Sequence, residues 1–277
     1  MVVKTLVENT AVSNRFNTEH GLSLYIETGK YKLLCDLGAS GLFLENAKKL
    51  GVNIKDIDFL VISHGHYDHG GGLREFLKHN KKAEVFVHHK AFNNYYSLRP
   101  DGSLKYIGLE AELKENRRLV FTADRFFIAE GIEVFSNVEG SALCSNANKT
   151  LLMEHENTTV EDIFLHEQNL VIREGECTTL FAGCSHRGIV NILNTFIGLK
   201  GRSLNYVFGG FHLYNPSLGQ SEPKELINQV GEYLKNTGAV YYTGHCTGEE
   251  AYNTLKGVMG DSLLRLFTGS EIRLNTT

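Results

Sequence analysis

The chain has 277 residues, with 28 Lys and Arg against 32 Asp and Glu, and a formal net charge of −4. A hydrophobic fraction of 42% argues against disorder, and an acidic chain without a Lys or Arg stripe does not offer the basic surface that binds nucleic acid. No apolar run approaches about 18 residues, and the apolar start of the chain is too short for a signal peptide, so we expect a cytoplasmic protein without a membrane span. The five cysteines are widely spaced and form no CxxC pair, which excludes a disulfide framework or a zinc ribbon.

The first hundred residues alternate short strands and helices. A Gly-containing turn between two apolar runs predicts a β-hairpin, and a fully apolar run of strand length predicts a buried strand. In chain order we expect a hairpin of residues 22–27 and 31–38, a helix at 43–51, a buried strand at 58–63, a second helix at 73–82 and another strand at 84–89.

Residues 91–160 are less regular, and we interpret them as an insertion over the active-site face with a binding or lid role. The last third returns to alternation. Strands are expected at 169–175, 177–183, 204–210 and 239–244, and helices at 189–197 and 224–236. Without repeats or linkers, residues 1–277 are interpreted as a single α/β domain with sheet inside and helices outside.

The strongest chemical feature is the run HGHYDH, which directly follows the predicted strand 58–63. Residues two apart on an extended chain point the same way, so His64 and His66 can bind one cation. Asp68 and His69 project from the turn that follows and can bind a second one. Imidazole and carboxylate ligands suit zinc, iron or manganese. Surface histidines on a loop are the alternative, but so many ligand-type residues at a buried strand end favour a metal site.

Three further histidines each come just after a predicted strand: His186 in GCSHRG, His212 in GGFH and His245 in GHCTG. Strand ends form the ligand-binding rim of an α/β sheet, so these residues can join the first motif in one cluster. We predict His186 and His245 as metal ligands, and His212 as a ligand or a proton-transfer group.

Other candidates have less support. Asp36 ends a hairpin strand, where it either orients a metal-bound histidine or simply forms a turn. Cys184 and Cys246 neighbour predicted ligands, and we interpret both as buried structural thiols. His166 could be a ligand, but it lies ahead of its strand. The remaining histidines are interpreted as pocket-wall, surface or unassigned residues: His20, His79, His88, His89 and His155.

HxHxDH at a strand end, with an upstream Asp-x-Gly and downstream strand-end histidines, resembles the metallo-β-lactamase superfamily. Segments that include LLCDLGASGLFLENAKKLG, HEQNLVI, GCSHRGIVNIL and GGFHL are similar to the branch named for dihydropterin (ribofuranosyl)aminobenzene phosphate synthase. The resemblance implies an αββα sandwich with a metal site at one edge, and a metal-bound water or hydroxide as the nucleophile. By position it implies a set of metal ligands: His64, His66, Asp68, His69, His186 and His245, with His212 in the GGFHL motif.

One position departs from this resemblance. Two-metal hydrolases of the superfamily commonly bridge their ions with an Asp after a strand, but here the comparable strand end has Cys184 after Gly183. The chain's one Gly-Asp pair, Gly260-Asp261, lies beyond His245, where a bridge is not expected. Either Cys184 or His186 replaces the bridge, or the second site is weak or empty.

These observations predict an enzyme that uses one or two zinc ions, with iron or manganese as alternatives. The metal would polarise a substrate oxygen and lower the pKa of a bound water from about 15.7 towards about 7. Asp68 would bind the second ion or orient the water, and His212 would transfer a proton near the leaving group. The positive charge of a histidine-rich metal centre favours a small anionic substrate, such as a phosphate ester.

Two other functions stay open. In a transferase, the metal would hold a pyrophosphate leaving group of a dihydropterin while an aryl acceptor attacks. Aromatic residues of the insertion could then stack a ring: Phe92, Tyr95, Tyr96 and Tyr106. The third function is an iron-dependent redox or sensing protein. Hydrolysis of β-lactams is the function least expected for a cytoplasmic protein.

Overall fold

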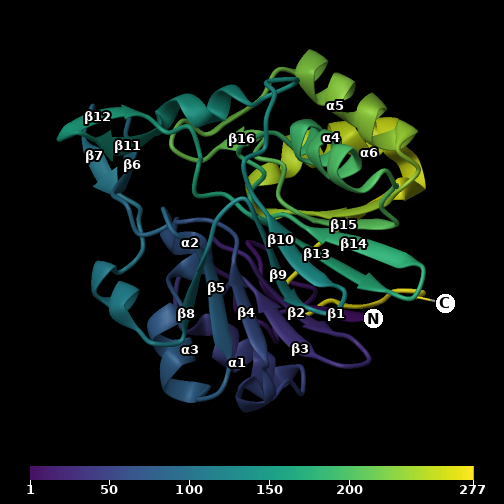
Figure 1. The fold of residues 1–277 in the computed structure, drawn as a ribbon. Coiled ribbons are helices and arrows are strands. Elements are labelled where there is room, and N and C mark those ends of the chain that lie inside the picture. The colour runs from purple at the N-terminus through teal and green to yellow at the C-terminus, as the bar shows by residue number, and fades with distance from the viewer. Residues whose placement is uncertain (277) are drawn as a thin grey trace.

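A computed structural model, which describes residues 1–276, consists of two seven-stranded sheets packed face to face (Figure 1). The first sheet contains, in order, β20 (Glu271–Arg273), β1 (Val2–Val7), β2 (Ser23–Glu27), β3 (Lys32–Cys35), β4 (Phe59–Ile62), β5 (Glu84–His88) and β8 (Leu119–Thr122). The second contains β19 (Leu263–Arg265), β18 (Val240–Thr243), β15 (Tyr206–Gly209), β14 (Cys177–Phe181), β13 (Asn169–Glu174), β10 (Ile132–Phe135) and β9 (Arg125–Ala129).

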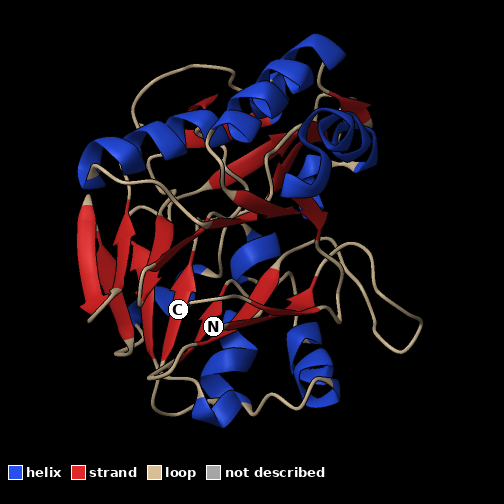
Figure 2. Cartoon of the chain, turned by 90° about the vertical axis from the view of Figure 1, so that its right-hand side faces the viewer, coloured by secondary structure: helices blue, strands red, loops and turns tan. Residues whose placement is uncertain are grey.

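Helices cover the outer face of each sheet, as Figures 1 and 2 show from two directions. The first sheet carries α1 (Leu42–Lys49), α2 (Tyr67–Gly70) and α3 (Leu73–His79), and the second carries α4 (Ile189–Lys200), α5 (Lys224–Asn236) and α6 (Glu249–Met259). Short 3₁₀ turns complete the helical segments, at Ile54–Asp56, Ala111–Glu115, Asn146–Thr150, His245–Thr247 and Gly260–Ser262. The predicted αββα sandwich is confirmed.

Apolar side chains fill the space between the layers. Ile26 and Phe86 of the first sheet meet Phe181 and Phe208 of the second in the central core. Separate apolar clusters lie between each sheet and its helices. Burial at this scale, at about 25 cal/mol per Å² of apolar surface, stabilises the sandwich and fixes the strand ends that carry the site.

Most predicted elements occur close to their predicted places. The hairpin is β2 and β3, which pair antiparallel with Leu24 opposite Cys35. One difference concerns the HGHYDH run, where the one-turn helix α2 begins at Tyr67, so Asp68 and His69 lie on a helix and not on a turn. Strand β1 was not predicted; it pairs with β2 and, across nearly the whole chain, with β20.

The range 91–160 divides between the core and the surface. Strands β6 (Tyr95–Leu98), β7 (Leu104–Tyr106), β11 (Leu151–His155) and β12 (Thr158–Glu161) form a separate four-stranded sheet, visible at the upper left of Figure 1. The rest of the range supplies β8, β9 and β10 to the main sheets. A small hairpin of β16 (Tyr214–Asn215) and β17 (Gln220–Ser221) follows β15. Within residues 1–276, no helix has the length and apolar character needed to cross a bilayer.

Parallel pairing brings the candidate residues to one edge of the sandwich. In the first sheet β3, β4 and β5 are parallel neighbours, and in the second β14, β15, β18 and β19 are. Parallel neighbours end at the same edge of a sheet. The loops that follow β3, β4, β14, β15 and β18 therefore converge there.

Candidate metal centre

All seven predicted site residues are buried and lie in overlapping groups of potential ligand atoms at this edge: His64, His66, Asp68, His69, His186, His212 and His245. They come from the loop after β4, from α2 and from the ends of β14, β15 and β18. The cluster has two parts. We call His64, His66 and His186 the histidine half, and Asp68, His69 and His245 the carboxylate half.

In the histidine half, the three rings face one another with centroids 4.6 to 5.0 Å apart. The Nε2 atoms of His64, His66 and His186 are buried and have no hydrogen-bond partner among residues 1–276. Each such atom costs about 1–3 kcal/mol unless something binds it. Burial lowers the pKa of all three imidazoles, which keeps them uncharged at neutral pH. Neutral, unpaired nitrogens fit a transition-metal cation.

In the carboxylate half, the ligand atoms are in contact with one another. The Nε2 atom of His245 lies 3.3 Å from Asp68 Oδ2 and 3.2 Å from Nε2 of His69. Burial alone would lower the pKa of His69, but Asp36 and Asp68 outweigh burial and raise it to about 9. Burial alone would raise the pKa of Asp68, but His69, His245 and His20 hold it well below its usual value. A cation bound here would replace the proton of His69 as the partner of Asp68.

Cys184 lies between the two halves. Its Sγ is within 4.8 Å of ligand atoms in both, and only 3.0 Å from His69 Nε2. Cys184 is buried as predicted. A purely structural thiol, however, would not need to lie among the candidate ligand atoms. Gly183 permits the close approach of this strand end, because a Cβ at Gly183 would lie 2.1 Å from Ser63 Oγ.

Hydrogen bonds from behind orient the ligands. Asp36 Oδ1 accepts a bond from the backbone N–H of Ser63, and Oδ2 accepts one from the Ser63 hydroxyl, both at 2.7 Å. The same Oδ2 lies 2.7 Å from His69 Nδ1, and Ser63 Oγ lies 2.9 Å from His64 Nδ1. Asp36 therefore occupies the orienting position considered above, and through Ser63 it supports both halves.

Several supporting residues were missed from the sequence. Asn9 Oδ1 lies 3.0 Å from His245 Nδ1, and Asn148 Oδ1 lies 3.1 Å from His186 Nδ1. His20, left unassigned, has its Nε2 3.4 Å from Asp68 Oδ2. Asn9 and His20 lie in loops and Asn148 in the 3₁₀ segment Asn146–Thr150, all far along the chain from their partners, and no local pattern marks them.

His166 supports the HGHYDH run from outside it. Its Nδ1 accepts a hydrogen bond from the Gly65 N–H at 2.8 Å, and its Nε2 lies 3.0 Å from Asp162 Oδ2. The carboxylate of Asp162 is 3.9 Å from Nε2 of His66. A histidine placed before its strand thus fixes the loop that carries His66.

His212 is positioned beside the histidine half and the two cysteines Cys184 and Cys246. Its ring centroid lies 4.2 Å from that of His186, and both of its ring nitrogens are buried and unpaired among residues 1–276. His212 and His245 have φ angles of +48° and +53°, a left-handed backbone that is costly for a residue with a Cβ. The geometry accommodates either predicted role of His212.

The other histidines lie outside the cluster. His88 and His89 stack on each other with centroids 4.4 Å apart, His79 contacts the carbonyl of Glu75 on its own helix, and His155 is exposed.

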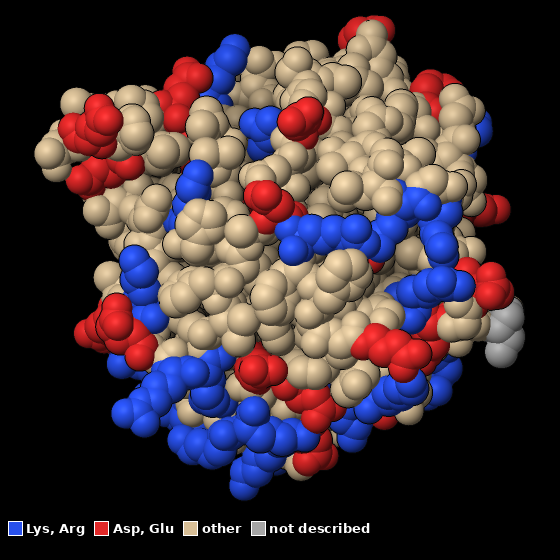
Figure 3. Space-filling model, viewed as in Figure 1, with Lys and Arg blue, Asp and Glu red and all other residues tan. Residues whose placement is uncertain are grey.

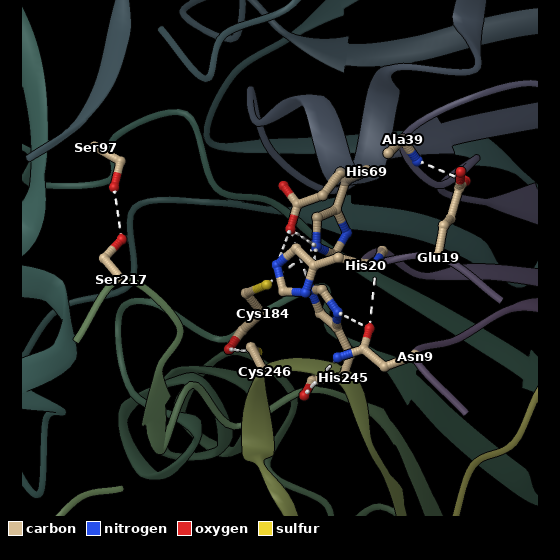
Figure 4. Close-up of polar contacts among 12 residues, drawn as sticks. Asn9, Glu19, His20, Ala39, His69, Ser97, Cys184, Ser217, His245 and Cys246 are labelled. Atoms are coloured by element: carbon tan, nitrogen blue, oxygen red, sulfur yellow. Dashed lines mark hydrogen bonds and ion pairs between the residues drawn. The ribbon is translucent and has the colours of Figure 1, made fainter. Parts of the chain in front are cut away.

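A pocket of about 670 Å³, counting the space open to solvent, lies above the cluster. Its floor includes His66, Asp68, His186, His212 and His245, and its walls come from the four-stranded sheet and the β16 loop. Figure 4 shows Ser97 and Ser217 of these walls to one side of the histidines. Among residues 1–276, the four aromatic residues proposed to stack a ring do not line the pocket: Phe92, Tyr95, Tyr96 and Tyr106. Tyr67, in contrast, does line it.

Comparisons with known proteins agree with this geometry. The family model of the metallo-β-lactamase superfamily matches residues 17–218. Two proteins of Methanocaldococcus jannaschii are each 30% identical to this chain. The match to MJ0448 covers 92% of this chain and 93% of that protein. The match to 7,8-dihydropterin-6-methyl-4-(β-D-ribofuranosyl)-aminobenzene-5'-phosphate synthase covers 98% of this chain and 96% of the synthase. The crystal structure of Tm1679, described as a metal-dependent hydrolase of the β-lactamase superfamily, has a TM-score of 0.81 at 27% identity and covers 99% of both chains.

The family and the fold agree with the resemblance found in the sequence. Members of the superfamily and the synthase relative are enzymes, which confirms the prediction of an enzyme of this fold. A cluster of His and Asp ligands is present where the metal of this fold is expected. The chain belongs to the metallo-β-lactamase superfamily.

Proposed function

We propose that the protein is a metal-dependent hydrolase of a small, anionic, phosphorylated substrate. The histidine half holds one cation and the carboxylate half holds a second, with zinc as the metal. The proposal rests chiefly on the buried, unpaired Nε2 atoms of His64, His66 and His186. Neutral imidazoles, a carboxylate and a nearby thiol are the donors that zinc binds best.

We assign the shared position between the cations to Cys184. Its sulfur lies within 4.8 Å of ligand atoms in both halves. It also comes from the strand end where, by the resemblance, two-metal enzymes of the superfamily have an aspartate. His186 lies in the histidine half instead. A thiolate would supply the negative charge that the missing aspartate would otherwise provide.

A bound cation supplies an electrophile for a substrate oxygen and lowers the pKa of water. The protein's own groups then position the reactants. Asp68, at the border of both halves, accepts a hydrogen bond from the attacking water or holds the second cation. His212 faces the pocket, and neither of its ring nitrogens has a geometric hydrogen bond within residues 1–276, so it can give a proton to the leaving oxygen.

The inner charge of the site, and not the outer surface, supports an anionic substrate. Lys and Arg side chains gather along the lower left edge of the face seen in Figure 3, and basic and acidic side chains are interspersed over the rest of it. The floor of the pocket is mainly histidine, and with cations bound it carries net positive charge.

A second candidate is transfer rather than hydrolysis. It is favoured by the 30% identity to the synthase over 98% of this chain. In this reaction an acceptor would replace water as the nucleophile. The metal bound by the same residues would hold a pyrophosphate leaving group. With the four insertion aromatics outside the pocket, Tyr67 is the aromatic side chain left to contact an aryl ring.

The test combines metal analysis with two assays. Protein purified without chelator should contain zinc, and treatment with EDTA should abolish hydrolysis of a panel of phosphate esters until zinc is restored. A dihydropterin pyrophosphate is then assayed with and without an aryl amine acceptor. Pyrophosphate release that requires the acceptor would establish transfer, and release without it would establish hydrolysis. Stoichiometric iron with a visible absorption band would favour the redox alternative, and absence of any transition metal would overturn the site.

A further inference from the structure

The lining of the pocket contains one Lys or Arg side chain among residues 1–276, Arg99. Arg99 follows β6 in the four-stranded sheet and is half-buried. Its Nη1 donates a hydrogen bond to Ser217 Oγ at 2.9 Å, and Ser217 Oγ lies 3.0 Å from Ser97 Oγ, a contact drawn in Figure 4. Within the described residues, no carboxylate lies within 4.0 Å of the guanidinium. Among residues 1–276, Arg99 thus faces the pocket above the candidate metal ligands without a carboxylate in direct contact, and Asp101 acts on its charge from a greater distance.

The backbone that carries these three side chains is held in place by other contacts. Asn215 Oδ1 accepts hydrogen bonds from the N–H of Ser217 at 2.9 Å and of Leu218 at 3.2 Å. Ser97 is 4% exposed on β6, and the N–H of Arg99 donates to Ser103 O at 2.9 Å across the β6–β7 turn. The donors are therefore positioned before any ligand arrives, which reduces the entropy cost of binding one.

The chemistry of this group is that of an oxyanion site. A guanidinium has five N–H donors in a planar fork, and within residues 1–276 the guanidinium of Arg99 has one hydrogen-bond acceptor, the hydroxyl of Ser217. Two adjacent hydroxyls can rotate to donate as well. A tetrahedral phosphate offers oxygens to all three side chains at once, whereas a planar carboxylate has only two.

We propose that Arg99, Ser97 and Ser217 bind a phosphate group of the substrate that is not the reacting group. This inference rests on the proposed function, because it takes the metal ligands below as the place where the bond is broken. The substrate class is then a molecule with two separated anionic groups. One lies over the metal ligands and the other is a phosphate held at the wall formed by the four-stranded sheet and the β16 loop.

The test measures binding and does not depend on turnover. Zinc-loaded protein is titrated calorimetrically with methylphosphonate and with a series of α,ω-alkane bisphosphonates of increasing length. One length should span both positions and bind more tightly than methylphosphonate. Arg99→Gln should reduce that gain by about tenfold to a hundredfold, the usual value of hydrogen bonds to a charged group, and leave the affinity for methylphosphonate and the zinc content unchanged.

Control variants separate this role from folding. Arg117→Gln removes the same charge from an exposed residue that does not line the pocket and should keep the full gain. Arg99→Lys keeps the charge without the fork and should keep part of it. The inference is wrong if no bisphosphonate gains over methylphosphonate, if Arg99→Gln keeps the gain, or if phosphonocarboxylates of the same length bind equally well. Failure of methylphosphonate to bind would instead contradict the metal-site proposal, and this inference with it.

Discussion

The two halves of the metal centre differ in the state of their ligand atoms before a cation binds. In the histidine half, each Nε2 is buried and has no hydrogen bond within residues 1–276, and burial lowers the pKa values. In the carboxylate half, Asp68, His69 and His245 are already in contact, and the pKa of His69 is raised to about 9.

This difference indicates unequal affinities for two cations. Binding at the histidine half relieves unpaired nitrogens and displaces no proton. Binding at the carboxylate half must replace internal contacts and release the proton of His69. We therefore expect the histidine half to hold the tighter cation, and the experiments below test that order.

The largest effect is expected for His66→Ala, which removes a ligand of the histidine half. Loss of a supporting partner typically lowers metal affinity about 10–100-fold, so loss of a ligand should cost more than about a hundredfold. Calorimetric zinc titration and elemental analysis measure it. His155→Ala, at an exposed site, is the control. Equal loss in both variants, or no loss in His66→Ala, would contradict the assignment.

Acid should empty the carboxylate half first. His69 is mostly protonated below pH 9, so zinc must displace a proton there, and its affinity should fall about a hundredfold between about pH 8 and about pH 6. The lowered pKa values of the histidine half keep its ligands deprotonated over the same range. Zinc content after dialysis at a series of pH values should drop in two steps. A single step would remove the proposed difference between the halves.

Asp36→Asn tests the support of His69. The amide cannot accept all three hydrogen bonds made to the carboxylate, so we expect about a 10–100-fold loss of affinity at the carboxylate half and a smaller change at the other. Asp56→Asn, at an exposed position, should change neither. Zinc titrations of the two variants give the result, and an equal loss at both halves would show that Ser63 carries the effect to His64.

The smallest effect is expected for Asn148→Ala, which removes the partner of His186 Nδ1. In this variant the backbone N–H of His186 still donates to Glu167, so the residue stays in position and only the orientation of its ring is weakened. We therefore expect the zinc affinity of the histidine half to fall by about tenfold. Asn93→Ala, at an exposed site of the same region, provides the comparison in zinc titration. A loss at the carboxylate half alone would reverse the assignment of His186.

The candidate ligands could be predicted because their signals are local. HGHYDH follows an apolar strand, and His186, His212 and His245 each stand at the end of another. Their orienting partners could not be predicted in the same way. Asn9 is 236 positions from His245 in sequence, and the loop that brings them together has no periodicity to read.

The layers of the fold could be predicted from the sequence, but some of the strand pairings could not. Alternating strands and helices identify the layers, since apolar periodicity is a property of each segment. The pairing of β1 with β20 and the division of residues 91–160 between three sheets depend on contacts far apart in sequence. The short helix α2 escaped prediction because its residues, Tyr67, Asp68, His69 and Gly70, are not strong helix formers.

The four-stranded sheet of β6, β7, β11 and β12 shares no strand with the two main sheets. It supplies Ser97 and Leu151 to the pocket, and its buried Tyr95 packs against the ring of His166. Within residues 1–276 the sheet adds no residue to the three apolar core clusters. Its sequence can therefore drift during evolution with little penalty in folding stability, while the ligand loops are constrained by the sandwich beneath. Among homologues with the same metal ligands, we expect divergence of substrate preference to concentrate in this sheet.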